Sequence, residues 1–349
     1  MKSTITLICV IITTTLFSCD FCGCFMGITP YDNQSNISVL YRYKMYNGYT
    51  NSGQHHNLFQ RSFISNTNNT ALTNSNGNYY TSKHGSSGTT AISAKAPRLQ
   101  SDFELFTTAE VRGKFFIHQR FELNAIIPFV MNSNSMNEKK EKIAGIGDLT
   151  FFTAFHVVNK TMTEKFQHRL IFGAGFKLPI GDYYAKNNEG ERIDFLMQPG
   201  TGSIDYMVYG NYVIGYKKLG LSLNSTYKLN GDNYYHERIG NGTTNYINIF
   251  YKFRQEKDFK IFPSIQGYYE YSKGVYINNL LQESTEMNIA TGGLGLDIFY
   301  KQLLINTSFH IPFYEKKFEY NPMLAGKFMV GITYNFNQKK YLFKSRTNA

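Results

Sequence analysis

Three cysteines near the N-terminus form the densest group of potential metal ligands in the chain. Cys19, Cys22 and Cys24 lie in the run Cys-Asp-Phe-Cys-Gly-Cys. Thiolates bind soft ions such as Cu(I) and Zn(II), so the three residues are a candidate metal site. In an oxidising compartment the same spacing favours the competing interpretation, which is a lipid anchor at Cys19 or a local disulfide.

The segment before these cysteines predicts export. Met1 and Lys2 precede a short apolar stretch over residues 5–17, which is typical of a secretory signal and too short for a membrane anchor. The run Leu16-Phe17-Ser18-Cys19 approximates a lipoprotein cleavage box, although Phe17 is bulkier than usual, and ordinary cleavage nearby is the alternative. We expect a signal peptide over 1–18 and a cysteine-containing segment over 19–35.

The histidines do not form an obvious catalytic group. His55 and His56 are adjacent, so their side chains point to opposite sides of an extended chain, which favours solvated loop residues over metal ligands. His168 leans outward by position, but no serine is clearly placed beside it. The chain also has no phosphate-binding glycine loop, His-Glu-x-x-His or Gly-x-Ser-x-Gly motif. We therefore predict no enzyme activity, no catalytic residues and no cofactor.

Composition indicates one large β domain rather than a nucleic-acid-binding protein. The chain has 349 residues, 27 Tyr, 29 Phe and a formal net charge of +11. Lys and Arg are dispersed along the chain and do not form one basic patch, so we expect no nucleic-acid partner. Apart from the N-terminal segment, no apolar run is long enough for a spanning helix.

Strict alternation of apolar and polar residues is the main structural signal. In residues 326–336, Phe328, Val330 and Ile332 fall on one side of a period-two strand, whereas Lys327 and Thr333 fall on the other. The pattern recurs about eleven more times upstream in segments of roughly ten residues. No Asp, Glu, Lys or Arg lies on an apolar row, although these residues make up 17% of the chain. Such rows face lipid in outer-membrane barrels.

The connections between these segments alternate between short and long. Short connections lie near 113–119, 159–166, 217–220, 255–258 and 301–302. Long connections lie near 47–100, 131–145, 180–202, 230–243, 272–287 and 313–325. Outer-membrane barrels have short periplasmic turns and longer outer loops. We therefore predict an all-β fold: a transmembrane, antiparallel, up-and-down barrel of about 12 strands over 36–336, without a plug domain. Its first outer loop would be 47–100, and 337–349 a polar periplasmic tail.

The polar rows give the candidate pore-lining residues, which share an inward position in this parsing and are mostly basic or acidic. They are Arg42, Lys44, Glu104, Glu110, Arg112, Glu122, His156, Arg169, Lys177, Asp205, Lys228, Lys252, Arg254, Glu270 and Asp297. Basic residues outnumber acidic residues on the inward rows, which predicts a modest preference for anions. The competing interpretation is that these charges only pair and brace the interior.

Four motifs resemble known outer-membrane proteins. Residues 22–35 resemble the N-terminus of outer-membrane transporters from Bacteroidetes. Gly145-Ile-Gly-Asp148, Leu178-Pro-Ile-Gly-Asp-Tyr183 and Gln198-Pro-Gly-Thr-Gly-Ser203 are similar to motifs of the channel family named for the meta-pathway of phenol degradation, most strongly over about 100–230. The resemblance implies a β-barrel channel, with uptake of aromatic or hydrophobic compounds in some members. It provides no catalytic residues.

These motifs also have a direct physical interpretation. Glycines permit sharp corners where strands meet outer loops. Asp148, Asp182, Gln198 and Ser203 are the candidate residues of the outer mouth, although the two aspartates more commonly bond turn amides.

The sequence thus predicts an outer-membrane channel of a Gram-negative cell that passes small solutes passively, with aromatic or hydrophobic compounds as candidate solutes. The expected partners are outer-membrane lipids, small-molecule solutes and the barrel-assembly machinery, which would recognise the closing strand ending at Phe336. A lipase-like barrel enzyme and a surface adhesin or structural barrel remain the alternative functions.

Overall fold

A computed structural model describes residues 34–47, 103–136, 139–163, 166–187, 189–256, 258–316 and 323–336. The predicted signal peptide, the cysteines Cys19, Cys22 and Cys24, nearly all of the 47–100 loop and the polar tail lie outside these residues. The metal, lipidation and cleavage predictions therefore concern parts of the chain that the structure does not describe.

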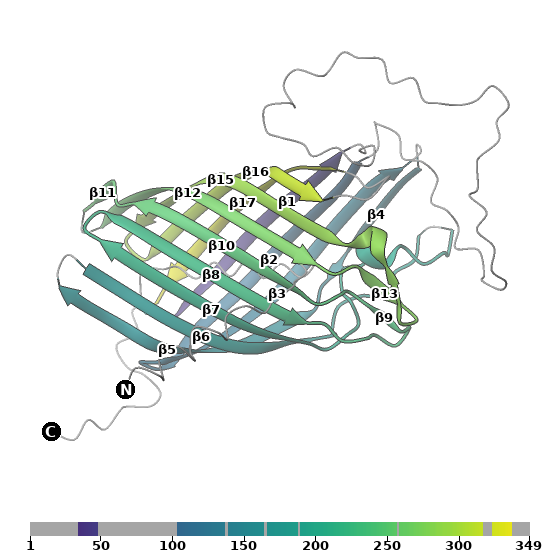
Figure 1. Ribbon diagram of the computed structural model, residues 1–349, viewed down its shortest axis with the longest axis horizontal. Coiled ribbons are helices and arrows are strands. Elements are labelled where there is room, and N and C mark those ends of the chain that lie inside the picture. Colours follow the sequence, from purple (N-terminus) through teal and green to yellow (C-terminus); the bar gives the residue numbers. More distant parts are fainter. Residues whose placement is uncertain are drawn as a thin grey trace, which may run out of the picture.

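The described chain folds into a closed antiparallel barrel (Figure 1). Its sheet has 14 strands, of which β4 (Lys139–Ile146) and β11 (Arg254–Gln255) pair with one neighbour only, and the remaining 12 complete the ring. The ring strands are β1 (Asn36–Asn47), β2 (Phe103–His118), β3 (Phe121–Met136), β5 (Leu149–Thr163), β6 (Phe166–Leu178), β7 (Asp205–Tyr216), β8 (Leu219–Leu229), β10 (Gly242–Tyr251), β12 (Phe259–Ser272), β15 (Met287–Tyr300), β16 (Leu303–Lys316) and β17 (Met323–Asn335). The predicted fold class is confirmed.

The first and last strands close the ring. β1 pairs with β2 on one side and with β17 on the other, from Asn36 opposite Asn335 to Asn47 opposite Met323. Beyond the ladder, the Phe336 N–H donates to the Ser35 carbonyl at 2.8 Å. Closure leaves no unpaired edge along the ring, which is what a strand-built protein needs in a lipid phase.

The two faces of the wall differ as the alternation predicts. Val39 and Ile332, on the apolar rows, are 55% and 56% exposed on the outside. Glu110 and Lys177, on the polar rows, are each 1% exposed, because their side chains point into the barrel. An exposed apolar exterior around a buried polar interior is the inverse of a soluble protein and matches a lipid-facing wall.

The outer end contains more regular structure than the sequence indicates. The connection predicted over 131–145 is instead a hairpin formed by the end of β3 and by β4, paired from Met136 opposite Lys139 to Phe129 opposite Ile146. A small sheet joins β9 (Glu237–Arg238), β13 (Val275–Ile277) and β14 (Leu280–Gln282).

Two single-turn helices complete the described elements: η2 (Phe195–Met197) and η3 (Glu283–Thr285). In the part of the chain described here, no helix has the length and apolar character needed to cross a membrane.

Replacing a lipid-facing residue by lysine should destabilise the barrel. Val208→Lys and Ile249→Lys place a cation on the apolar exterior, and each should lower the free energy of unfolding by about 2–4 kcal/mol near the bilayer midplane. Urea titration of protein refolded into lipid vesicles measures this change. Leu229→Lys, at the outer end of β8, is the matched control with an expected cost of about 0–1 kcal/mol. Equal costs at all three positions would contradict the assigned orientation.

Candidate functional site

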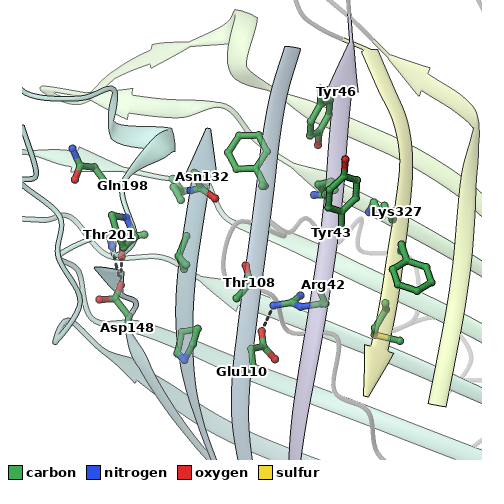
Figure 2. A pocket seen from close by; sticks show the side chains of 18 of the residues that line it. Arg42, Tyr43, Tyr46, Thr108, Glu110, Asn132, Asp148, Gln198, Thr201 and Lys327 are labelled. Atoms are coloured by element: carbon green, nitrogen blue, oxygen red, sulfur yellow. Dashed lines mark hydrogen bonds and ion pairs between the residues drawn. The ribbon is translucent and has the colours of Figure 1, made fainter. Parts of the chain in front are cut away.

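A cavity of about 140 Å³ lies inside the barrel, between the wall and the β6–β7 loop that folds inward. Figure 2 shows Arg42, Glu110 and Lys327 on the wall side and Gln198 and Thr201 on the loop side. The lining combines cations, carboxylates and aromatic rings. Its principal side chains are Arg42, Lys44, Tyr46, Phe106, Glu110, Asp148, Lys177, Phe195, Thr201, Tyr268 and Lys327.

One carboxylate on β2 joins two guanidinium groups. Glu110 pairs with Arg42 of the adjacent strand β1, and Arg112 Nε donates to Glu110 Oε2 at 2.7 Å. Glu110 and Arg112 are two residues apart, so both side chains leave the same face of the strand. Glu110 is buried and needs such partners to remain charged inside the barrel.

A second carboxylate joins two lysines across the interior. Lys44 and Lys327 lie directly opposite each other on β1 and β17, an arrangement that repels like charges. Glu270 Oε2 lies 3.0 Å from Lys327 Nζ and 3.7 Å from Lys44 Nζ. Because β15 and β16 separate β12 from β17 in the wall, this contact spans the interior and does not follow the sheet. Lys327 Nζ also lies 4.1 Å from the centre of the Tyr268 ring.

A third group differs from these two, because it contains one cation between two carboxylates. Lys177 Nζ lies 3.0 Å from Asp148 Oδ2 and 2.6 Å from Asp205 Oδ2, and all three side chains are buried. Asp148 Oδ2 also accepts the Thr201 N–H at 2.8 Å, and Asp148 Oδ1 accepts the Gly181 N–H at 3.1 Å. The group thus fixes both ends of the β6–β7 loop.

The middle of this loop packs inside the outer half of the barrel. Gln198 acts as a brace, because its Oε1 accepts the Ala185 N–H at 2.9 Å and its Nε2 donates to the Ile193 carbonyl at 2.8 Å. Asn132 Nδ2 of β3 donates to the Met197 carbonyl at 3.0 Å. Ile193 and Met197 are buried together with Ile143 of β4, and Phe106 of β2 packs against this cluster. A loop between β6 and β7 therefore reaches the wall formed by β2, β3 and β4.

A partly buried ion pair ties the same loop to the rim. Arg192 donates to both Glu237 oxygens, at 2.6 and 2.8 Å, and this hydrogen bonding raises the pKa of Arg192. The Arg192 guanidinium also lies 4.9 Å from the Tyr235 ring centre, and Tyr235 stacks on Tyr184 with centroids 4.9 Å apart. The outer rim thus carries an aromatic and cationic cluster above the inner cavity.

The structure brings only some of the predicted pore-lining residues together. Arg42, Lys44, Glu110, Arg112 and Glu270 gather at the cavity wall, and Lys177 and Asp205 at its outer side, as described above. Glu122 and His156 form a separate buried pair, with Glu122 Oε2 3.2 Å from His156 Nε2. Glu104, Arg169, Lys228 and Asp297 lie at other positions of the wall, and Lys252 lies in the segment that follows β10.

One predicted pore-lining residue departs from the expected position. Arg254 lies in the short strand β11, its side chain is 51% exposed, and it pairs with Glu256 at 2.7 Å. The period-two assignment is wrong there because two residues, Lys252 and Phe253, interrupt the ladder between β10 and β11.

The residues predicted at the outer mouth have three different environments. Asp148 and Ser203 are buried in the Lys177 group, where Ser203 Oγ donates to Asp205 Oδ1 at 2.8 Å. Gln198 is buried within the loop, and only Asp182 is exposed.

Sequence reasoning missed the aromatic lining. Tyr46, Phe106 and Tyr268 occupy inward positions on strands whose inward rows we examined for charge alone, and Phe195 lies in a connection with no periodic signal. Aromatic residues on otherwise polar rows are the signal that would have identified the first three.

The candidate metal site at Cys19, Cys22 and Cys24 and the alternative of a lipase-like barrel enzyme are not tested by the described residues. Within them, no group of three or more His, Cys, Asp or Glu side chains could hold a metal ion. His168, the residue on which a lipase-like activity would depend, packs its ring against Phe166 at 5.8 Å.

Comparisons with known proteins agree with this architecture. The model of the family described as "Putative MetA-pathway of phenol degradation" matches residues 73–316. Among solved structures, an outer membrane channel from Pseudomonas putida F1 is similar, with a TM-score of 0.55 and 11% identity over 87% of this chain and 96% of that chain. The β domain of the Bordetella autotransporter BrkA has a TM-score of 0.44 and 7% identity over 87% of this chain and 100% of its own. The search of curated protein sequences found no match.

Removing the central cation of the Lys177 group should release the loop and destabilise the barrel. Lys177→Met leaves Asp148 and Asp205 as uncompensated buried carboxylates, which should cost about 3–5 kcal/mol of unfolding free energy. Urea titration in lipid vesicles measures the cost. The double variant Lys177→Met with Asp205→Asn removes one of the two charges and should recover part of the loss. A cost below about 1 kcal/mol for the single variant would contradict this role.

Proposed function

Because this chain belongs to the family described as MetA-pathway of phenol degradation, we propose that it is an outer-membrane channel through which small solutes, aromatic compounds among them, cross passively. The observation that carries the proposal is a closed barrel with an apolar exterior and a polar interior that contains the cavity. The fold shared with the Pseudomonas putida F1 outer membrane channel supports it.

The dimensions of the interior favour small solutes over large ones. An interior formed by 12 strands is intermediate between side-chain-filled barrels and wide porins. Here the Glu270–Lys327 contact crosses the interior and the β6–β7 loop occupies its outer half. The remaining cavity of about 140 Å³ is close to the size of engineered apolar cavities of about 150 Å³ that accept one benzene molecule.

The exterior and the closing strand account for the proposed location and partners. Outer-membrane lipids would cover the apolar rows, because these rows expose large side chains such as Val208, Leu294 and Phe328. The barrel-assembly machinery would recognise β17, which ends next to Phe336, where the ring closes. We therefore propose the outer membrane of a Gram-negative cell as its location.

The interior charges should give the open channel a weak preference for anions. Purified protein in planar bilayers should conduct, and its reversal potential in a salt gradient should favour chloride over potassium, because cations are in excess on the inward rows. Arg112→Glu and Lys252→Glu should each reduce the preference. Lys218→Glu, which makes the same charge change on the exposed β7–β8 turn, is the control and should leave it nearly unchanged. Preference for cations in the unmodified protein would contradict the assignment, and absence of conductance would contradict channel activity.

A further inference from the structure

We propose that a cluster of tyrosines at the outer rim is a reception site for single uncharged aromatic rings, of which phenol is a simple example. The rim cluster consists of Tyr183, Tyr184, Tyr234 and Tyr235 and lies next to β9 (Figure 1). The inference rests on the proposed function, since it names the place where an aromatic solute would first contact the channel. The cluster has three relevant features: exposed rings, rigid support and a connection to the cavity.

The rings are more exposed than the ion pair that joins the two loops. Tyr234 is 81% exposed and Tyr184 is 45% exposed, whereas the side chains of Arg192 and Glu237 are 21% and 11% exposed. A solute that arrives at the rim therefore meets the tyrosine rings before it meets the charges. Such rings bind other aromatic rings through offset or edge contacts, with centroids about 4.5–7 Å apart.

The rings of the cluster already contact one another in the geometries that aromatic groups prefer. Tyr235 stacks on Tyr184, with centroids 4.9 Å apart and an interplanar angle of 17°, and Tyr234 meets Tyr235 edge to face at 5.3 Å. Among the described residues, Tyr234 has no ring contact other than Tyr235. A solute ring can therefore extend the series at Tyr234.

A hydrogen-bonded turn presents the ring of Tyr234. Asn233 Oδ1 accepts the N–H groups of Tyr235 at 2.9 Å and of Glu237 at 3.0 Å, and the Asn233 N–H donates to the Glu237 carbonyl at 2.9 Å. Glu237 also pairs with Arg192, which ties this turn to the β6–β7 loop. A ring on a preorganised turn loses little conformational freedom on binding, so more of the contact energy remains as affinity.

The same two segments connect the rim cluster to the cavity. Asn233 Nδ2 donates at 3.1 Å to the carbonyl of Thr201, a residue of the cavity lining. Ile239, on the segment that carries Tyr235, and Phe195, on the β6–β7 loop, also belong to the lining. A solute that leaves the rim cluster inward therefore meets apolar and aromatic side chains of the two segments that held it outside.

Binding at the rim should be weak. A passive channel needs sites that a solute enters readily and leaves again. Contact with one or two exposed rings provides only a small part of the affinity that an enclosed pocket would give, so we expect a dissociation constant for phenol of about 1 mM.

Fluorescence of a single tryptophan tests the site independently of transport. The full chain contains no Trp, so Tyr234→Trp introduces one reporter whose ring can still stack. Titration of the detergent-solubilised protein compares phenol with cyclohexanol, which keeps the ring size and the hydroxyl but is not aromatic, and with glucose. Phenol should change the emission saturably and bind about two- to tenfold more tightly than cyclohexanol.

Matched variants separate the site from general partitioning and from loss of the turn. Tyr300→Trp places the reporter at an exposed tyrosine at the opposite end of the barrel, and phenol should cause no saturable change there. In the Tyr234→Trp protein, Tyr235→Leu should weaken phenol binding by about two- to tenfold, whereas Tyr235→Phe, which keeps the ring, should not. Heat-dependent gel mobility verifies that each variant is a folded barrel.

The outcomes separate the site from the channel. Equal affinity for phenol and cyclohexanol, the same phenol response in the Tyr300→Trp protein, or unchanged phenol affinity in the Tyr235→Leu variant overturns the site. An emission change with glucose but not with phenol would assign the cluster to saccharides and also overturn it. Conductance without saturable phenol binding would refute the site and leave the channel proposal standing. Saturable phenol binding that depends on the Tyr235 ring, in a protein that does not conduct, would support the site and refute the channel.

Discussion

Every backbone N–H and C=O of the wall needs a partner because lipid supplies none, and closure of the ring by β1 and β17 meets that constraint. Once the ring is closed, strict alternation sends every second side chain to lipid and the others inward. The apolar exterior and the charged interior are therefore two results of the same geometry.

The interior charges are arranged in groups that hold separate parts of the chain together. Glu270 connects β12 to β1 and β17 across the interior, and Lys177 connects β6 to Asp148 and Asp205 at the outer end. Such buried groups contribute little net stability when compared with apolar packing, but removal of one member is costly. We therefore regard their main effect as positional: they determine where the loop lies and how much of the interior remains open.

The wall could be predicted from the sequence, but the cavity could not. Residues such as Val39, Val208 and Ile332 repeat at period two, and this local signal fixes both strand and orientation. Contacts such as Lys327 with Glu270 join residues far apart in the chain, and no periodicity encodes them. The alternation also placed Arg254 inside, because the pattern carries no information about an interrupted ladder.

The direction of the β6–β7 loop is another feature that could not be predicted from the sequence. The motifs around Asp148, Gln198 and Ser203 were recognised as corners of the outer mouth, yet two of these three residues hold an inward-folded loop through buried side chains. A glycine-rich motif predicts a turn, but the direction of the loop after the turn depends on partners such as Asn132 and Lys177, which belong to other strands.

The tip of the inward loop has different constraints from its base. Asn187 Oδ1 accepts the N–H groups of Glu189 and Glu191, and Gly190, at φ +82°, has open space around it. Extra residues inserted there would lengthen the loop without displacing Phe195 or Thr201, because the buried contacts begin beyond the turn. This turn can therefore change in length and sequence while the buried contacts that shape the interior stay the same.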